Sequence, residues 1–155
     1  MKKRLVCYFS ATGVTKEVAE KVSQILSGDL FEIEPVLKYS NEDLDWTNKK
    51  SRSSVEMASE ESRPEIVHQV KNIDDYQEVI IGFPVWWYRE PSIIDTFMEE
   101  NHLEGKDIYV FVTSGGSGIE ECLVSLKKKY PSLHFVSGKR LNTSLQESDI
   151  LSWMK

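Results

Sequence analysis

Long apolar runs are absent from this sequence, and their absence excludes a membrane-spanning helix. Polar residues interrupt every hydrophobic stretch well short of the about 20 residues that cross a bilayer. The N-terminus is basic, but the apolar run that follows stops at Ser10 and no small-residue cleavage site comes after it. This is not the layout of a secretory leader. We therefore expect a cytoplasmic protein with no membrane partner.

Cysteine and histidine are scarce. Cys7 and Cys122 are too few for a disulfide framework, and we expect two buried, reduced thiols. No cluster has the spacing of metal ligands, so we expect no metal site. Ser10 and Ser114 have no histidine or aspartate partner at motif spacing, which argues against a hydrolase. The histidines are isolated from one another: His68, His102 and His134.

An excess of positive charge is also missing. Acidic residues number 25 against 19 basic ones, for a formal net charge of −6. A chain of this charge is poorly suited to nucleic acid or to an anionic membrane surface. It is suited to docking on a partner protein with a basic surface.

The residues that are present predict one α/β domain over residues 1–155. Apolar β-rich segments alternate about five times with helical patterns, which predicts a parallel sheet with helices on both faces. We expect Gly28 to end the first helix and Pro64 to open a short helix carrying Ile66, Val67 and Val70. Capping boxes are expected at Ser117/Glu120 and Ser144/Glu147. The expected strands are residues 5–9, 30–34, 78–83, 107–113 and 133–136, and the other helices begin near Val14, Pro91, Ile119 and Ser144.

Residues 38–63 form a polar and charged segment without sustained periodicity. We expect a loop with no regular structure, and loops this long in a small domain are often functional. A mobile surface insertion is the alternative. Trp46 favours a functional loop, because an aromatic side chain in such a segment usually covers something.

The run Ser10-Ala11-Thr12-Gly13-Val14-Thr15 joins the first strand to a helix. A helix N-terminus with free N–H groups, three hydroxyl side chains and one glycine can hold a phosphate without a cationic side chain. The run lacks the Gly-Lys-Ser/Thr ending of a P-loop and the three glycines of a dinucleotide loop. The alternative is an ordinary strand-to-helix turn with a hydroxyl cap. Val14 is assigned to the apolar face of the helix.

Two further loops follow strand ends. One is Pro84-Val85-Trp86-Trp87-Tyr88, and the other is Thr113-Ser114-Gly115-Gly116-Ser117-Gly118. Ligands of open α/β sheets bind at the carboxyl ends of the strands. Phosphate donors, flat aromatic side chains and glycine backbone at that edge together predict a planar, phosphorylated ligand. The alternative for the tryptophans is that both anchor the following helix to the core.

These motifs resemble the flavodoxin family. The first loop is similar to its Ser/Thr-x-Thr-Gly-x-Thr phosphate loop, and residues 82–87 resemble the Gly-Tyr-Pro-x-Trp-Trp loop of a subgroup of short flavodoxin-like proteins. The resemblance implies a three-layer flavodoxin-like fold, strand order 2-1-3-4-5 and noncovalently bound FMN. Residues 10 and 12–15 would hold the phosphate, residues 84–88 would line the ring, and residues 113–118 would contact the ring edge and ribityl chain.

Two departures from the family pattern bear on redox behaviour. The third loop carries no aromatic residue, and Tyr88 stands where relatives often have glycine. A residue with a Cβ flips its peptide less readily to bond the reduced ring.

The resemblance implies an FMN-dependent electron carrier between redox proteins. The alternative is an NAD(P)H-dependent FMN oxidoreductase with a small quinone-like acceptor. A flavin-free receiver or regulatory domain is a remote alternative, because Phe9-Ser10 stands where a receiver needs acidic residues.

Overall fold

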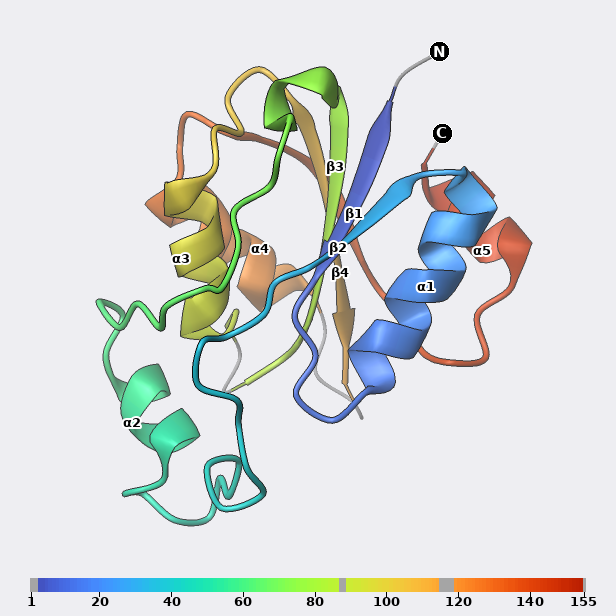
Figure 1. The fold of residues 1–155 in the computed structure, drawn as a ribbon. Helices are drawn as coiled ribbons and strands as arrows, with labels where there is room; N and C mark the ends of the chain where they lie inside the picture. The colour runs from blue at the N-terminus through green and yellow to red at the C-terminus, as the bar shows by residue number, and fades with distance from the viewer. Residues whose placement is uncertain (1–2, 87–88, 115–118, 155) are drawn as a thin grey trace.

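The computed structural model describes residues 3–86, 89–114 and 119–154 (Figure 1). Strands and helices alternate along the chain. In order they are β1 (Arg4–Tyr8), α1 (Val14–Leu26), β2 (Asp29–Glu32), α2 (Arg52–Ala58), the 3₁₀ turn η1 (Ile73–Asp75), β3 (Glu78–Pro84), α3 (Ser92–Glu100), β4 (Asp107–Thr113), α4 (Glu120–Lys129), β5 (His134–Arg140) and α5 (Glu147–Trp153).

The strands form one parallel sheet in the order β2-β1-β3-β4-β5. This is the order that the resemblance implied, and it confirms the predicted fold class. β3 and β4 lie at the centre and are buried almost throughout, which is why both read as continuous apolar runs. A register shift between β4 and β5 falls at Ile108/Tyr109.

Alternate side chains of the strands supply two separate cores. Cys7, Ile81 and Val110 belong to the core covered by α3 and α4. Val6 and Ile80 belong to the core covered by α1 and α5. Figure 1 shows α3 and α4 on one side of the sheet and α1 and α5 on the other. The sheet therefore lies between two helical layers, and the strand ends remain available for a site.

Gly82 is placed under an aromatic ring. It lies in register with Phe111 on the neighbouring strand. A Cβ added at Gly82 would lie 2.0 Å from Cζ of Phe111. Glycine therefore lets the Phe111 ring lie across β3 just before the loop that begins at Pro84.

The segment 38–63 contains helix α2, so the expectation of a loop without regular structure is wrong there. The Ser51 Oγ accepts a hydrogen bond from the Ser54 N–H at 3.4 Å, and Arg52 pairs with Glu56 at 2.9 Å. A cap and an i,i+4 ion pair both stabilise a short helix. Figure 1 shows α2 beyond the lower end of the sheet, apart from the two helical layers.

The helix expected after Pro64 does not form in residues 64–71, all of which are described. Ile66 forms a bridge with Pro35, and the Val67 N–H donates to the Glu34 carbonyl at 2.9 Å. The extended backbone thus pairs with residues 34–36 while Ile66 still reaches the core. The backbone hydrogen bonds with the chain after β2 therefore outweigh the local preference of residues 64–71 for a helix.

Three helix caps also differ from those that the sequence predicted. Ser27, not Gly28, takes the left-handed conformation after α1, and Gly28 packs against Arg4 instead. At α4 the residue that precedes the helix is Ile119, and Ser117 of the expected capping box lies outside the described residues. At α5 the capping box is formed by Gln146 and Asp149. In each case the helix begins or ends within two residues of the position that the pattern predicted.

Candidate functional site

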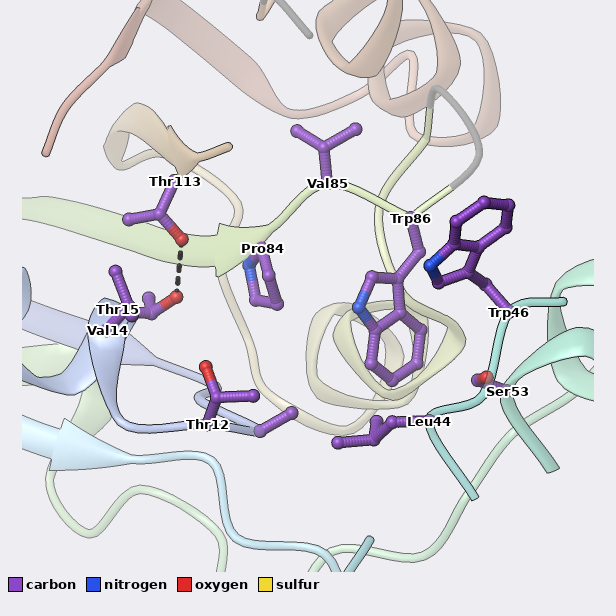
Figure 2. Close-up of a pocket in the computed structure, with 11 residues that line it drawn as sticks. Thr12, Val14, Thr15, Leu44, Trp46, Ser53, Pro84, Val85, Trp86 and Thr113 are labelled. Atoms are coloured by element: carbon purple, nitrogen blue, oxygen red, sulfur yellow. Dashed lines mark hydrogen bonds between the residues drawn. The ribbon is translucent and has the colours of Figure 1, made fainter. Parts of the chain in front are cut away.

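A cavity of about 500 Å³ opens at the carboxyl ends of the strands. Its volume lies in the range of small-molecule sites. Figure 2 draws the residues that line it as sticks. They come from the loop after β1 and the first turn of α1, from the ends of β3 and β4 and the loop after β3, and from the segment before and within α2: Ala11, Thr12, Val14, Thr15, Leu44, Trp46, Ser53, Pro84, Val85, Trp86 and Thr113.

The loop after β1 presents an open helix N-terminus. Gly13 precedes α1 with φ 99°, a left-handed conformation that favours glycine. In the part of the chain that the structure describes, no side chain caps this helix, so the alternative of a hydroxyl-capped turn is wrong. The Ser10 Oγ instead accepts from the Gly13 N–H at 3.0 Å. The first intrahelical bond runs from Glu17 to Gly13, which leaves the N–H groups of the first turn available to an anion.

The hydroxyls of this loop have different surroundings. Thr15 is buried, and its Oγ1 lies 2.7 Å from Oγ1 of Thr113. Thr12 is exposed and lines the cavity. Val14 is 47% exposed and lines the same cavity, so its assignment to the buried helix face is wrong. The position just after Gly13 belongs to the site because the first helical turn faces it.

The loop after β3 supplies an aromatic wall. Trp86 lines the cavity and also packs edge-on against Phe9 and Tyr39, with centroid distances of 5.7 and 5.4 Å. Its backbone exchanges hydrogen bonds with Arg89 at 3.3 and 3.2 Å. Trp86 is thus both a core anchor and a pocket residue. Trp87 and Tyr88 lie outside the described residues.

The loop after β4 begins at Thr113, whose carbonyl accepts from the Val85 N–H at 3.2 Å. Ser114 lines an adjoining hollow of about 340 Å³, and its carbonyl accepts from Arg140. Gly115, Gly116, Ser117 and Gly118 lie outside the described residues. Leu141 and Asn142 also line this hollow. They were missed, although their place after the last strand could have indicated them.

Leu44, Trp46 and Ser53 form the wall contributed by the segment 38–63. Trp46 is 73% exposed. Ser53 is buried, and among the described residues its Oγ has no hydrogen-bond partner. Ser53 and Leu44 were not expected to belong to the site, because no local pattern shows which face of a short helix turns to a cavity.

Helix α2 is tied to the loop after β3. The Arg89 guanidinium donates to the carbonyls of Glu56, Met57 and Ser59 at 3.0–3.4 Å. The Tyr39 hydroxyl donates to Glu56, and the Arg52 guanidinium lies 3.8 Å from the Tyr39 ring centroid. These contacts fix the position of α2 relative to the loop after β3, and these two elements carry two walls of the cavity.

A buried ionic cluster lies directly behind this loop. Glu90 and Asp95 are fully buried, and Lys129 Nζ lies 2.8 Å from the first and 3.2 Å from the second. Burial and the Glu90 carboxylate raise the pKa of Asp95 to about 7, against the opposing effects of Lys129 and Tyr130. Arg89 lies 3.8 Å from Asp95 and so joins the cluster to α2.

The described residues offer few other reactive side chains. Cys7 and Cys122 are free and buried, as predicted, and burial raises the pKa of both thiols, that of Cys122 to about 12. The described residues hold no group of three or more histidine, cysteine or acidic side chains arranged for a metal ion. Among the described residues there is also no helix with the length and hydrophobicity to span a bilayer.

The parallel sheet, with an anion-competent helix N-terminus beside an aromatic wall, defines a flavodoxin-like α/β protein. The flavodoxin family matches residues 3–155, and the chain belongs to that family. No curated protein matches the sequence.

Solved structures agree with this assignment. A candidate flavoprotein from Bacteroides eggerthii DSM 20697 is 46% identical, with a TM-score of 0.97 over 99% of this chain and 96% of its own. Another from Bacteroides uniformis ATCC 8492 is 40% identical, with a TM-score of 0.93 over 99% and 97%. A flavoprotein from Lactobacillus acidophilus NCFM in complex with FMN is 24% identical, with a TM-score of 0.76 over 100% of both chains, and shares the fold.

Proposed function

We propose that this protein binds FMN in the cavity and carries electrons between redox proteins. The observation that carries the proposal is the shared cavity: the uncapped N-terminus of α1 and the Trp86 wall face the same space. Membership of the flavodoxin family and the FMN complex of the Lactobacillus flavoprotein support FMN as the cofactor.

The residues present fit this cofactor. The N–H groups of the first turn of α1 and the Thr12 hydroxyl would hold the phosphate, because a dianion is stabilised by helix N–H groups and hydroxyl donors. Trp86, Pro84 and Leu44 offer apolar surface to the ring. When bound, the flavin supplies the redox chemistry, and the protein binds, orients and shields it.

We propose a cytoplasmic partner protein with a basic docking surface. The net charge of −6 would steer such a partner toward this chain. Electron transfer should then slow as salt screens the attraction.

An NAD(P)H-dependent quinone reductase is the second candidate. Its support is the small side chains of Thr113 and Ser114 at the start of the third loop, opposite the Trp86 wall. Small side chains there leave space for a planar substrate.

One anaerobic experiment separates the two functions. The FMN form is mixed with NADH or NADPH in a stopped-flow instrument, and the photoreduced form is mixed with cytochrome c or with a quinone. An electron carrier is reduced slowly by the nicotinamides and transfers electrons to the basic cytochrome in a salt-dependent manner. Fast reduction by NADPH followed by rapid quinone reduction would make the protein a reductase. Failure to bind FMN would overturn both.

A further inference from the structure

Tyr39 packs behind the aromatic wall of the cavity. Its ring lies edge-on to Trp86 at a centroid distance of 5.4 Å and edge-on to Phe9 at 5.6 Å. Trp86 lines the cavity, whereas Tyr39 is not one of the described residues that line it. Two oxidisable side chains, Trp86 and then Tyr39, are therefore in contact one behind the other from the cavity inward.

The phenol of Tyr39 has a proton acceptor in place. Its hydroxyl donates to Oε1 of Glu56 at 2.5 Å. The other oxygen of this carboxylate, Oε2, accepts from Nε of Arg52 at 2.9 Å. The Glu56 side chain is only 13% exposed. A short hydrogen bond from a hydroxyl to a shielded carboxylate is a strong one, and it gives the phenol proton a fixed path to Glu56.

Arg52 governs what the Tyr39 ring can do. Its guanidinium carbon lies 3.8 Å from the ring centroid. A cation over an aromatic face is attracted to the neutral ring and opposes a positive charge on it. Burial and the hydrogen bond to Glu56 raise the pKa of Tyr39, so the phenol keeps its proton at rest. Tyr39 can therefore give up an electron only if its proton leaves together with the electron.

We propose that Tyr39 is a redox-active tyrosine that restores Trp86 after a one-electron oxidation from the cavity. One electron passes from Tyr39 to the Trp86 radical cation, and the phenol proton moves to Oε1 of Glu56. Trp86 is thereby re-reduced, Tyr39 becomes a neutral radical and Glu56 becomes a neutral acid, so the total charge is unchanged. The oxidant is a one-electron acceptor in the cavity. A light-excited flavin is such an acceptor, and this source of oxidation rests on the proposed function.

The consequence of this transfer is protection of the cavity wall. A tryptophan that stays oxidised reacts irreversibly with oxygen. Transfer to Tyr39 moves the oxidising equivalent away from the cavity. When the reduced acceptor returns its electron to Tyr39, the proton moves back from Glu56 to the phenol and every group regains its starting state.

The first test needs no flavin. The variant Trp46→Phe/Trp87→Phe/Trp153→Phe keeps Trp86 as its only tryptophan. Azide radicals from pulse radiolysis oxidise this tryptophan, and transient absorption follows the radical. We expect the tryptophan signal to decay while a tyrosyl signal grows in, and we expect the further change Tyr39→Phe to abolish that growth. If the growth persists without Tyr39, the proposal is wrong.

Tyr109 supplies the matched control. It also packs edge-on against a tryptophan, Trp153, at 5.7 Å, but in the core covered by α1 and α5. In the same single-tryptophan variant, Tyr109→Phe should leave the transfer from Trp86 unchanged. Equal loss of transfer in Tyr39→Phe and Tyr109→Phe would point to disturbed packing and would overturn the role of Tyr39.

The proton step has a separate readout. Glu56→Gln keeps an oxygen that accepts the hydrogen bond, but an amide does not take the proton as a carboxylate does. We expect slower transfer in Glu56→Gln, and slower transfer in heavy water than in ordinary water when Glu56 is present. Unchanged rates in both comparisons would show that the proton does not move to Glu56.

Illumination in air tests the protection itself. The FMN-bound wild type, Tyr39→Phe and Tyr109→Phe are exposed to blue light, and mass spectrometry measures oxidation of Trp86. We expect oxidised Trp86 to accumulate faster in Tyr39→Phe than in the other two proteins. Equal accumulation in all three would overturn the protective role. A wild-type protein that binds no FMN would instead overturn the proposed function, and the radiolysis result would still decide the role of Tyr39.

Discussion

The side-chain oxygens of Thr15 and Thr113 lie 2.7 Å apart although the two residues are 98 positions apart in sequence. One belongs to the first turn of α1 and the other ends β4. Both are buried and both line the cavity. This hydrogen bond joins the first turn of α1 to the end of β4, so it fixes the spacing of two walls of the cavity.

Thr113→Val should destabilise the flavin-free protein. It leaves the buried Thr15 hydroxyl unpaired, which costs about 1–3 kcal/mol in the free energy of unfolding. The double variant Thr15→Val/Thr113→Val should recover much of this loss, because neither hydroxyl then remains. Urea denaturation measures both. A Thr113→Val protein as stable as the wild type would contradict the pairing.

Thr12→Ala should weaken FMN by about ten- to a hundredfold, since a hydrogen bond to a charged group contributes about 1.5–3 kcal/mol. Riboflavin, which lacks the phosphate, should bind the variant nearly as it binds the wild type. Titration of the flavin-free protein with each ligand gives the comparison. Equal losses for the two ligands would show that Thr12 does not contact the phosphate.

Trp46→Ala should weaken FMN by about two- to tenfold, because an aromatic contact contributes about 0.5–1.5 kcal/mol beyond area burial. Leu37→Ala is the control: Leu37 is 70% exposed immediately before the segment 38–63 and is not among the residues that line the cavity. Fluorescence titration measures both affinities. If the two variants bind FMN alike, Trp46 does not cover the flavin.

Stability should fall as the pH rises from about 4 through about 7. The pKa of Asp95 is raised to about 7 in the folded protein, above its unfolded value of about 3.9. Between these values the folded state binds more protons than the unfolded state, so rising pH favours unfolding. The groups that face Asp95 are Glu90, Lys129, Tyr130 and Arg89.

Asp95→Asn should flatten this pH dependence, because the variant cannot ionise at that position. Asp75→Asn, a change of an exposed carboxylate, should leave it as in the wild type. Urea denaturation of the flavin-free protein at pH 5, 6, 7 and 8 gives the slopes. If the stability of wild type and of Asp95→Asn changes with pH in the same way, the proton that is bound on folding is not held by Asp95.

The sheet and the three strand-end loops could be predicted because their signals are local. β3 and β4 are continuous apolar runs, and Pro84 and Thr113 stand at their ends. Helix α2 could not be predicted from periodicity, because it spans seven residues and is stabilised by a cap and one ion pair. For residues 64–71 a helix was predicted and the structure has extended chain. The apolar pattern misled here because an extended chain can bury Ile66 as well as a helix can.

Within the site, the residue types were predictable but their partners were not. The loop sequence indicated hydroxyl donors at Thr12 and Thr15. Only packing between distant elements decides that Thr15 bonds Thr113 while Thr12 faces the cavity. The same holds for Ser53, whose lack of a partner is a property of the assembled cavity.

The bonds from Arg89 to the end of α2 bear on how the cofactor leaves. Because one guanidinium links the loop after β3 to the wall that carries Ser53, movement of either wall away from the other breaks these hydrogen bonds. We expect release of the flavin to require a local opening of residues 38–63. Its rate should be independent of the concentration of competing flavin and should rise in mild denaturant. We therefore expect the lifetime of the complex to follow the stability of the chain around the ligand as well as the ligand's own contacts.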